Sequence, residues 1–250
     1  MSDFERGATR SIPQTADMSI DAGLRAFMLG VYNKMALGLL LSAAVAYAVA
    51  TIPAIRDILF VVSETGAFRG YTLPGMILAF APLALVLISG FAMRNPSPAG
   101  SAALYWTIVS VIGASSAVWV LRYTGGSIAS TFLITATAFG ALSLFGYTTK
   151  RDLTGMGSFL IMGVWGLLLA SIVNIFLKAP MLHFIISGLG VLIFAGLTAY
   201  DTQRLKMTYY QIGGDQTALG VATNYGALSL YLDFINLFQF LLAFLGVRRD

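Results

Sequence analysis

Two aspartates lie in or directly after the last two apolar segments of the chain. Asp233 lies inside the apolar run 226–245, and Asp201 closes the preceding apolar run 181–200. If such a run crosses a membrane, an ionised carboxylate near its centre costs roughly 2.5–3.5 kcal/mol. Acids in this position are therefore expected to face a polar interior and to have partners there. Asp201 and Asp233 are the residues most informative about function.

The two acids are predicted to act as a pair. At a rise of about 1.5 Å per residue, both fall within about two helical turns of the same predicted membrane boundary. Two carboxyl groups in one low-dielectric site cannot both ionise cheaply, so the pair is expected to hold one proton at neutral pH and to respond to acidity. The alternative is a structural role, with Asp233 buried, neutral and hydrogen-bonded.

Other polar residues fall on the same helical face as Asp233. Gly226, Ser229, Asp233 and Asn236 are spaced 3, 4 and 3 apart, which places them on one side of a helix. A membrane helix with one polar stripe belongs inside a bundle, with that stripe turned towards its neighbours or towards a water-filled cavity. Ser229 and Asn236 are therefore candidate pore-lining or supporting residues.

The composition is that of a membrane protein. Hydrophobic residues make up 58% of the 250 residues and charged residues 10%, and the mean hydropathy is +0.82. Soluble domains usually carry about 25% charged residues. With no cysteine and only one histidine, His183, thiolate and multi-histidine metal sites are excluded. The net charge is +4, but the basic residues form no continuous run, so no nucleic-acid partner is expected.

We predict an all-α integral membrane protein with seven transmembrane helices. A span needs roughly 20 apolar residues, and the segments that meet this length are 35–55, 71–93, 102–121, 128–147, 156–176, 181–200 and 226–245. Residues 1–34 form a polar N-terminal segment that is too long and too acidic for a signal peptide, so the first span is expected to be uncleaved. The transmembrane domain is then 35–250, and its longest connections are 56–70 and 201–225.

The distribution of basic residues predicts the orientation. One side of the predicted membrane holds nine Lys and Arg, namely Arg6, Arg10, Arg25, Lys34, Arg94, Lys150, Arg151, Arg204 and Lys206. The other side holds six, namely Arg56, Arg69, Arg122, Lys178, Arg248 and Arg249. The positive-inside rule then favours a cytoplasmic N-terminus and an external C-terminus. Lys178, Arg122 and His183 fit an interfacial role near the external ends of their helices.

Arg94 closes the second predicted span on the same side as Asp201. A guanidinium keeps its charge at any physiological pH. An ionised Asp201 could therefore pair with Arg94 and tie the second span to the sixth, and protonation of the acid would release that tie. The alternative is a snorkelling or topology-setting arginine.

Three segments resemble the Bax-inhibitor-1 family, also called the transmembrane Bax-inhibitor-motif family, and in particular its bacterial members. The resemblance runs from about residue 25 onward. Its most specific parts are Gly-Tyr-Thr-Thr-Lys-Arg-Asp-Leu at 146–153, Gly-Leu-Thr-Ala-Tyr-Asp-Thr-Gln at 196–203 and Ala-Leu-Ser-Leu-Tyr-Leu-Asp-Phe-Ile-Asn-Leu-Phe at 227–238.

This resemblance implies a seven-helix bundle with the last helix at its centre, in the bacterial inner membrane. It implies a pH-sensitive calcium leak controlled by a pair of hydrogen-bonded aspartates, which Asp201 and Asp233 match. Arg94, in Phe91-Ala-Met-Arg94, occupies the position of the family's gating arginine, although Asn95-Pro96 follows where relatives often carry more basic residues. Ca²⁺ and H⁺ would be the partners, with Ca²⁺ as transported ion and no cofactor.

Ca²⁺ prefers several oxygen ligands, and the two carboxylates with Ser229 and Asn236 would form a weak transit site. The sequence leaves a channel and a Ca²⁺/H⁺ exchanger open. A second function class is a non-transporting regulator that binds another membrane protein, such as a membrane protease. An intramembrane aspartyl protease is disfavoured, because Leu230-Tyr-Leu precedes Asp233 where those enzymes carry Gly-x-Gly. No enzymatic activity is expected.

Overall fold

The computed structural model describes residues 22–64, 66–92, 96–212 and 214–249, with only the backbone course for 89–92. Helices account for most of this part of the chain, and one short antiparallel β-hairpin interrupts them. The elements are α1 (Ala22–Thr51), α2 (Pro53–Leu59), β1 (Phe60–Val62), β2 (Phe68–Tyr71), α3 (Leu73–Ala92), α4 (Pro98–Arg122), α5 (Gly125–Thr148), α6 (Thr154–Leu177), α7 (Pro180–Ile212) and α8 (Gln216–Leu245).

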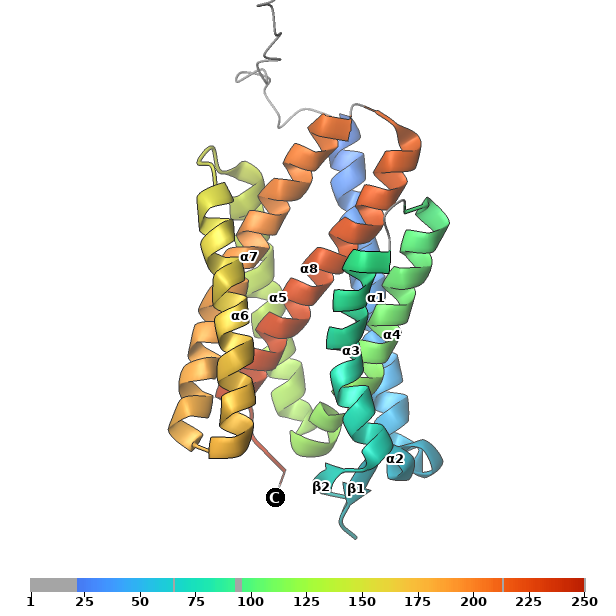
Figure 1. Cartoon of the computed structure of the whole chain (residues 1–250), viewed down its shortest axis with the longest axis vertical. Coiled ribbons are helices and arrows are strands. Elements are labelled where there is room, and N and C mark those ends of the chain that lie inside the picture. The colour runs from blue at the N-terminus through green and yellow to red at the C-terminus, as the bar shows by residue number, and fades with distance from the viewer. Residues whose placement is uncertain (1–21, 65, 93–95, 213, 250) are drawn as a thin grey trace, which may run out of the picture.

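The long helices lie side by side, and α8 crosses the middle of the bundle (Figure 1). It passes between a group formed by α1, α3 and α4 and a group formed by α5, α6 and α7, and it packs against α1, α4, α5 and α7. The hairpin and the C-terminus lie at one end of the bundle, which we call the hairpin end. The start of α1 and the turn between α7 and α8 lie at the opposite end, which we call the N-terminal end.

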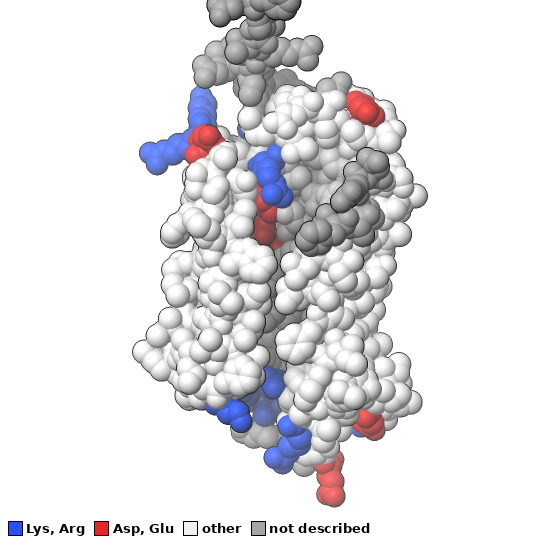
Figure 2. Space-filling view, in the orientation of Figure 1, with Lys and Arg blue, Asp and Glu red and all other residues white. Residues whose placement is uncertain are grey.

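Six of the described helices are long and apolar enough to cross a membrane: α1, α4, α5, α6, α7 and α8. The apolar part described for α3, Leu73–Ile88, is shorter than a span, so a seventh crossing stays a prediction. Large apolar side chains are exposed along the sides of the helices, and the face in Figure 2 carries its charges mainly near the two ends. This distribution fits a protein surrounded by lipid.

The first helix is longer than its apolar segment. We predicted a span over 35–55 preceded by a polar segment, whereas α1 begins at Ala22 and ends at Thr51. Leu24, Phe27 and Val31 are buried on one face of the added turns, where the ring of Phe27 lies 5.6 Å from that of Tyr209 in α7. Hydropathy missed this extension because Arg25 and Lys34 interrupt the apolar run, while the packing face remains apolar.

The predicted connection 201–225 is wrong. Helix α7 continues to Ile212 and α8 begins at Gln216, so both helices extend beyond the apolar runs. Asp215 supplies the N-cap of α8 by accepting hydrogen bonds from the backbone N–H groups of Thr217 and Ala218, at 2.8 and 3.2 Å. The extended parts of α1, α7 and α8 pack on one another, as the contacts of Phe27 with Tyr209 and of Gly30 with Thr223 show. This packing stabilises turns that carry too many polar residues to be recognised as membrane spans.

The predicted connection 56–70 also contains regular structure. It holds α2 and the hairpin, where the rings of Phe60, Phe68 and Tyr71 pack together with centroids 5.0–6.0 Å apart. The guanidinium of Arg122 lies 4.3 Å from the centre of the Phe68 ring. Arg122 is thus held at the base of the hairpin as well as at a helix end.

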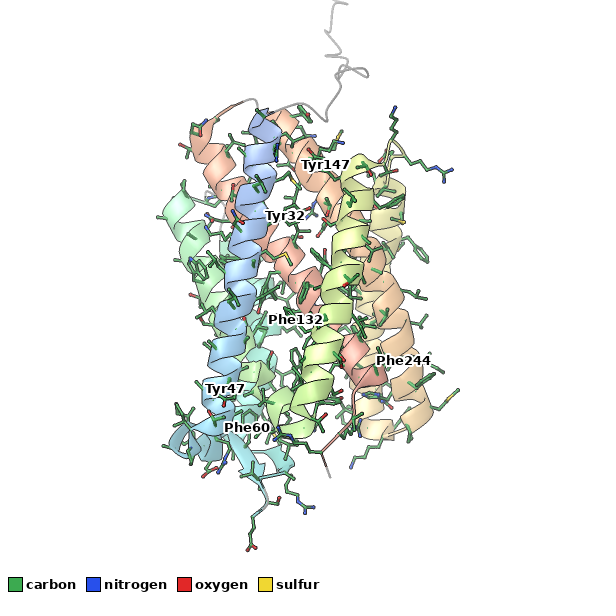
Figure 3. All side chains as sticks on the ribbon, turned by 180° about the vertical axis from the view of Figure 1, so that it is seen from behind. Tyr32, Tyr47, Phe60, Phe132, Tyr147 and Phe244 are labelled. Atoms are coloured by element: carbon green, nitrogen blue, oxygen red, sulfur yellow. The ribbon has the colours of Figure 1, made fainter. Side chains whose placement is uncertain are left out.

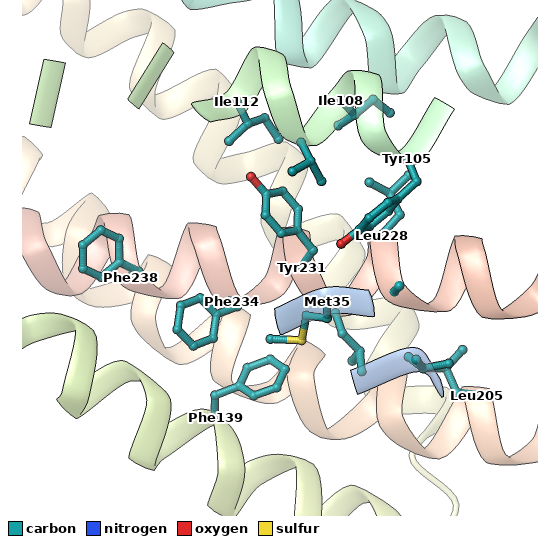
Figure 4. Packing of buried hydrophobic residues seen from close by; sticks show 14 of the residues in the cluster. Met35, Tyr105, Ile108, Ile112, Phe139, Leu205, Leu228, Tyr231, Phe234 and Phe238 are labelled. Atoms are coloured by element: carbon teal, nitrogen blue, oxygen red, sulfur yellow. The ribbon is translucent and has the colours of Figure 1, made fainter. Parts of the chain in front are cut away.

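The largest core cluster surrounds α8 (Figure 4). Tyr231 is fully buried among residues of α1 and α4, and its hydroxyl lies 2.6 Å from Ser42 Oγ. Ser42 donates to the carbonyl oxygen of Val109 at 2.8 Å, so Tyr231 must be the donor to Ser42. Phe234 packs on Phe139 of α5, with ring centroids 5.4 Å apart. These contacts fix the rotation of α8 and decide which of its residues face α7.

Candidate functional site: the buried aspartates of α7 and α8

Asp201 of α7 and Asp233 of α8 lie next to each other inside the bundle. Only 6% of Asp201 and 5% of Asp233 is exposed. Ser229, one helical turn before Asp233 on α8, donates a hydrogen bond to Asp201, so the two acids lie on facing sides of α7 and α8. Coupled titration of the two neighbouring carboxyl groups stays a prediction.

Asp201 is held by two side chains. Ser229 Oγ of α8 donates a hydrogen bond to Asp201 Oδ2, and Nη2 of Arg204 lies 3.4 Å from Asp201 Oδ1. The same Arg204 nitrogen donates to Ser229 Oγ at 3.2 Å. These three residues form a polar triad that joins α7 to α8, and about half of the Arg204 side chain remains exposed.

The carboxyl group of Asp233 has fewer hydrogen-bond partners among the described residues than that of Asp201. Its Oδ2 is buried, and no residue in the described part of the chain gives it a hydrogen-bond partner. An unpaired buried acceptor costs roughly 1–3 kcal/mol, and more when it is charged. The atom is therefore open to a proton, a water molecule or a cation.

A chain of hydroxyl groups approaches the pair from α1 and α5. Thr202 Oγ1 donates to the carbonyl oxygen of Thr198 at 2.8 Å, so it accepts from Ser143 Oγ, which lies 3.0 Å away. Ser143 must in turn accept from the hydroxyl of Tyr32. Figure 3 shows Tyr32 and Tyr147 towards the N-terminal end. This chain links α1, α5 and α7 immediately beside Asp201.

The three segments that carry the family resemblance meet at this site. Gly146 of α5 leaves no room for a Cβ, because the carbonyl of Ala199 in α7 occupies that space. Gln203 accepts from the backbone N–H of Leu153 at 2.8 Å and donates to the carbonyl of Arg151 at 2.7 Å. Segment 146–153 is thereby fixed to 196–203, and the polar triad fixes 196–203 to 227–238.

The sequence-predicted residues do not all join the pair. Asn236 donates to Leu232 O of its own helix at 2.8 Å, which leaves its amide oxygen for another partner. Arg94 lies outside the described residues, so its pairing with Asp201 stays a prediction. The cation that does contact Asp201 is Arg204, which sequence reasoning missed. The i,i+3 spacing of Asp201 and Arg204 on one helix was the available signal.

The site offers few ligands to a metal. Over the part of the chain that the structure describes, no three His, Cys, Asp or Glu gather into a group that could hold an ion. The pair itself and Ser229 supply carboxylate and hydroxyl oxygen atoms. A Ca²⁺ ion usually takes 6–8 oxygen ligands, more than these three residues supply.

A model of the family described as "Inhibitor of apoptosis-promoting Bax1" matches residues 24–250. The chain is 67% identical to an uncharacterized protein of Caulobacter vibrioides, with 100% of each covered. It is 44% identical to an uncharacterized protein of Rickettsia prowazekii, covering 97% of this chain and 98% of the relative. It is 43% identical to the inner membrane protein YbhL of Escherichia coli, covering 91% of this chain and 94% of that relative.

Proposed function

We propose that this chain, which belongs to the family of inhibitors of apoptosis-promoting Bax1, is a pH-sensitive calcium-leak channel gated by Asp201 and Asp233. It is an integral membrane protein, and its relatives include a bacterial inner membrane protein. The proposal is supported by the burial of both carboxyl groups on two helices that pack together and are long enough to span a membrane, with one oxygen of Asp233 unpaired among the described residues. The named relative YbhL supports placement in the bacterial inner membrane.

Protonation of Asp201 is the proposed switch. When Asp201 is ionised, it holds Ser229 of α8 and Arg204 of α7 in the polar triad. When Asp201 takes up a proton, Arg204 keeps its charge and loses its partner, because a guanidinium does not titrate in this range. The contact between α7 and α8 then weakens, and falling pH increases the population of the open state.

Asp233 is the proposed contact for the ion. Its unpaired buried oxygen and the oxygen atoms of Asp201 and Ser229 would replace part of the hydration shell of Ca²⁺. With so few ligands the ion would bind weakly and leave readily, as a leak requires. Arg94 stays in the proposal as a second cation, acting on Asp201 from the end of the second apolar segment.

Flux into vesicles of pure protein tests the proposal. Proteoliposomes carrying an internal Ca²⁺ indicator are stepped from about pH 8 to about pH 6. The parent protein should leak more at the acidic pH, and Asp201→Asn and Asp233→Asn should each abolish the response. Asp57→Asn removes an exposed aspartate at the hairpin end and should leave the response unchanged.

The same measurement separates the alternatives. Absence of flux at both pH values in folded protein would favour a non-transporting regulator of another membrane protein. Flux that requires an opposing proton gradient would indicate a Ca²⁺/H⁺ exchanger. A response that survives both Asp→Asn substitutions would refute gating by the pair. Proteolysis is disfavoured because residues 230–232, Leu-Tyr-Leu, precede Asp233 and supply no glycine to admit a substrate backbone.

A further inference from the structure

A second polar site lies between α6, α7 and α8, at the hairpin end of the bundle. It is a half-open cavity of about 350 Å³ at the turn that joins α6 to α7. Asn174, Lys178, His183 and Gln239 contribute polar groups to its wall, and Ile186 and Phe240 contribute apolar surface. Figure 3 shows Phe244, one residue beyond the last lining residue of α8, at this same end.

The polar lining, to which Ser171 and Ser187 also belong, offers several hydrogen-bond donors. Lys178 carries an ammonium group, and His183 and Gln239 supply N–H groups. The amide oxygen of Asn174 accepts from the backbone N–H of Ala179 at 3.1 Å, which leaves its NH₂ group able to donate into the cavity. None of the described lining residues is an aspartate or glutamate. Such a wall suits an anion and would repel Ca²⁺.

Lys178 adopts a backbone conformation that is unusual for a lysine. It ends α6 in the left-handed conformation, with φ 50° and ψ 34°, and no other non-glycine residue in the described ranges has a positive φ. Helices commonly end in this conformation on glycine or asparagine, which adopt it at less steric cost. A lysine here therefore adds a charge at the mouth of the cavity that backbone geometry does not require.

The apolar surface around the opening of the cavity indicates that the anion is part of a lipid. The side chains of Phe176, Leu177, Met181 and Phe184 beside it are 53–80% exposed, as expected for a surface immersed in lipid. We propose that the cavity binds the phosphate group of an anionic phospholipid in the leaflet at the hairpin end. Lys178 and His183 would contact the phosphate, and one acyl chain would lie along Ile186 and Phe240. The proposal does not depend on ion transport.

Competition between two lipids tests this site. The full chain is placed in nanodiscs with equal amounts of phosphatidylglycerol and phosphatidylcholine and released into detergent, and the retained lipids are counted by native mass spectrometry. The parent should retain phosphatidylglycerol preferentially. Lys178→Asn removes the charge with a residue suited to the left-handed conformation, and should lower that retention about fivefold, the effect expected of one lysine near an anionic surface.

Three controls fix the interpretation. Lys178→Arg should retain the lipid, and Lys150→Asn, the same loss of charge at an exposed residue of the opposite end, should behave as the parent. His183→Gln, which leaves the left-handed residue in place, should also lower retention and serves if Lys178→Asn does not fold. Equal retention by the parent and both cavity variants would overturn the proposal. So would displacement of the lipid by inorganic phosphate, because the site would then take the free anion.

Discussion

At the scale of single residues, function depends on polar side chains that reach across helix boundaries. Ser229 of α8 donates to Asp201 of α7, and Arg204 of α7 contacts both. Ser42 of α1 joins Tyr231 of α8 to the backbone of α4. The first set can change when a proton is added, whereas the second contains no group that titrates at physiological pH. We therefore expect the first to control opening and the second to control stability.

Arg204→Gln should loosen the closed state without greatly destabilising the protein. The side chain is half exposed, and exposed ion pairs usually contribute about 0–1 kcal/mol, so the thermal midpoint should change little. Loss of the cation should nevertheless raise Ca²⁺ leak at about pH 8 towards the level the parent reaches at about pH 6. Arg151→Gln, an exposed arginine in the loop before α6, is the matched control. Unchanged leak in Arg204→Gln would remove Arg204 from the gate.

Tyr231→Phe should lower stability and leave the pH response intact. The hydroxyl that is removed is buried and donates to Ser42, which still keeps its own bond to Val109 O. A net loss of about 0.5–1.5 kcal/mol is expected for one such hydrogen bond. The free energy of unfolding, measured by denaturant titration in detergent, gives the loss directly. Tyr47→Phe, at a tyrosine that is 65% exposed, should have no effect.

At the scale of elements, close helix contacts fix the site. Gly146 lets α5 approach the backbone of α7 at Ala199, two residues before Asp201. Gly113 does the same for α4 against the backbone of α1 at Ser42. Small residues at such crossings allow the van der Waals packing that drives helix association in lipid.

Two glycines of the same helix provide a matched test of this contact. In Gly146→Ala the new Cβ would meet the backbone of Ala199 and push α5 from α7, at a cost of about 1–3 kcal/mol. Gly140→Ala places its Cβ in open space and should stabilise α5 by about 0.5–1 kcal/mol through helix propensity. Thermal midpoints of the two variants should therefore move in opposite directions. A shift of the same sign in both would mean that this crossing does not limit α5–α7 packing.

At the scale of the whole molecule, the directions of the helices relate the start of α1 to the end of α8. Helix α1 begins at the N-terminal end, and α8 begins at that end and finishes at the hairpin end beside the C-terminus (Figure 1). The tail is fixed there, because Arg249 N–H donates to Arg122 O at 2.8 Å and Val247 N–H to Ser127 Oγ at 2.9 Å. Termini on opposite sides of a membrane require an odd number of crossings.

A topology reporter tests this arrangement and the orientation. We expect a reporter fused after Asp250 to report the external side, and one inserted after Lys150 to report the cytoplasmic side. This result follows from the bias in Lys and Arg between the two sides and from α3 acting as the seventh span. Two reporters on the same side would mean that one of α6, α7 and α8 does not cross, because only these helices lie between Lys150 and Asp250. A third reporter, placed before α1, tests α3: if it lay on the side opposite to the reporter after Lys150, the short apolar stretch of α3 would not cross the membrane, and the predicted level of Arg94 would be wrong.

The sequence alone determined the class of the protein and the residues most worth testing. Composition and the lengths of the apolar runs predicted a helical membrane protein, because only segments whose backbone hydrogen bonds are internal can cross lipid. The cost of a carboxylate in lipid singled out Asp201 and Asp233. Helix periodicity placed Ser229 on the face of Asp233. These inferences depend on local chemistry and on a single helix.

Tertiary packing decided what no single helix could specify. Ser229 of α8 became a partner of Asp201 because the rotation of α8 turned its hydroxyl towards α7, and this rotation depends on contacts such as those of Tyr231 with α1 and α4. The extra turns of α1, α7 and α8 formed because their apolar faces bury one another, which hydropathy averaged over a window cannot detect. The cavity beside Lys178 likewise takes its lining from three helices, α6, α7 and α8.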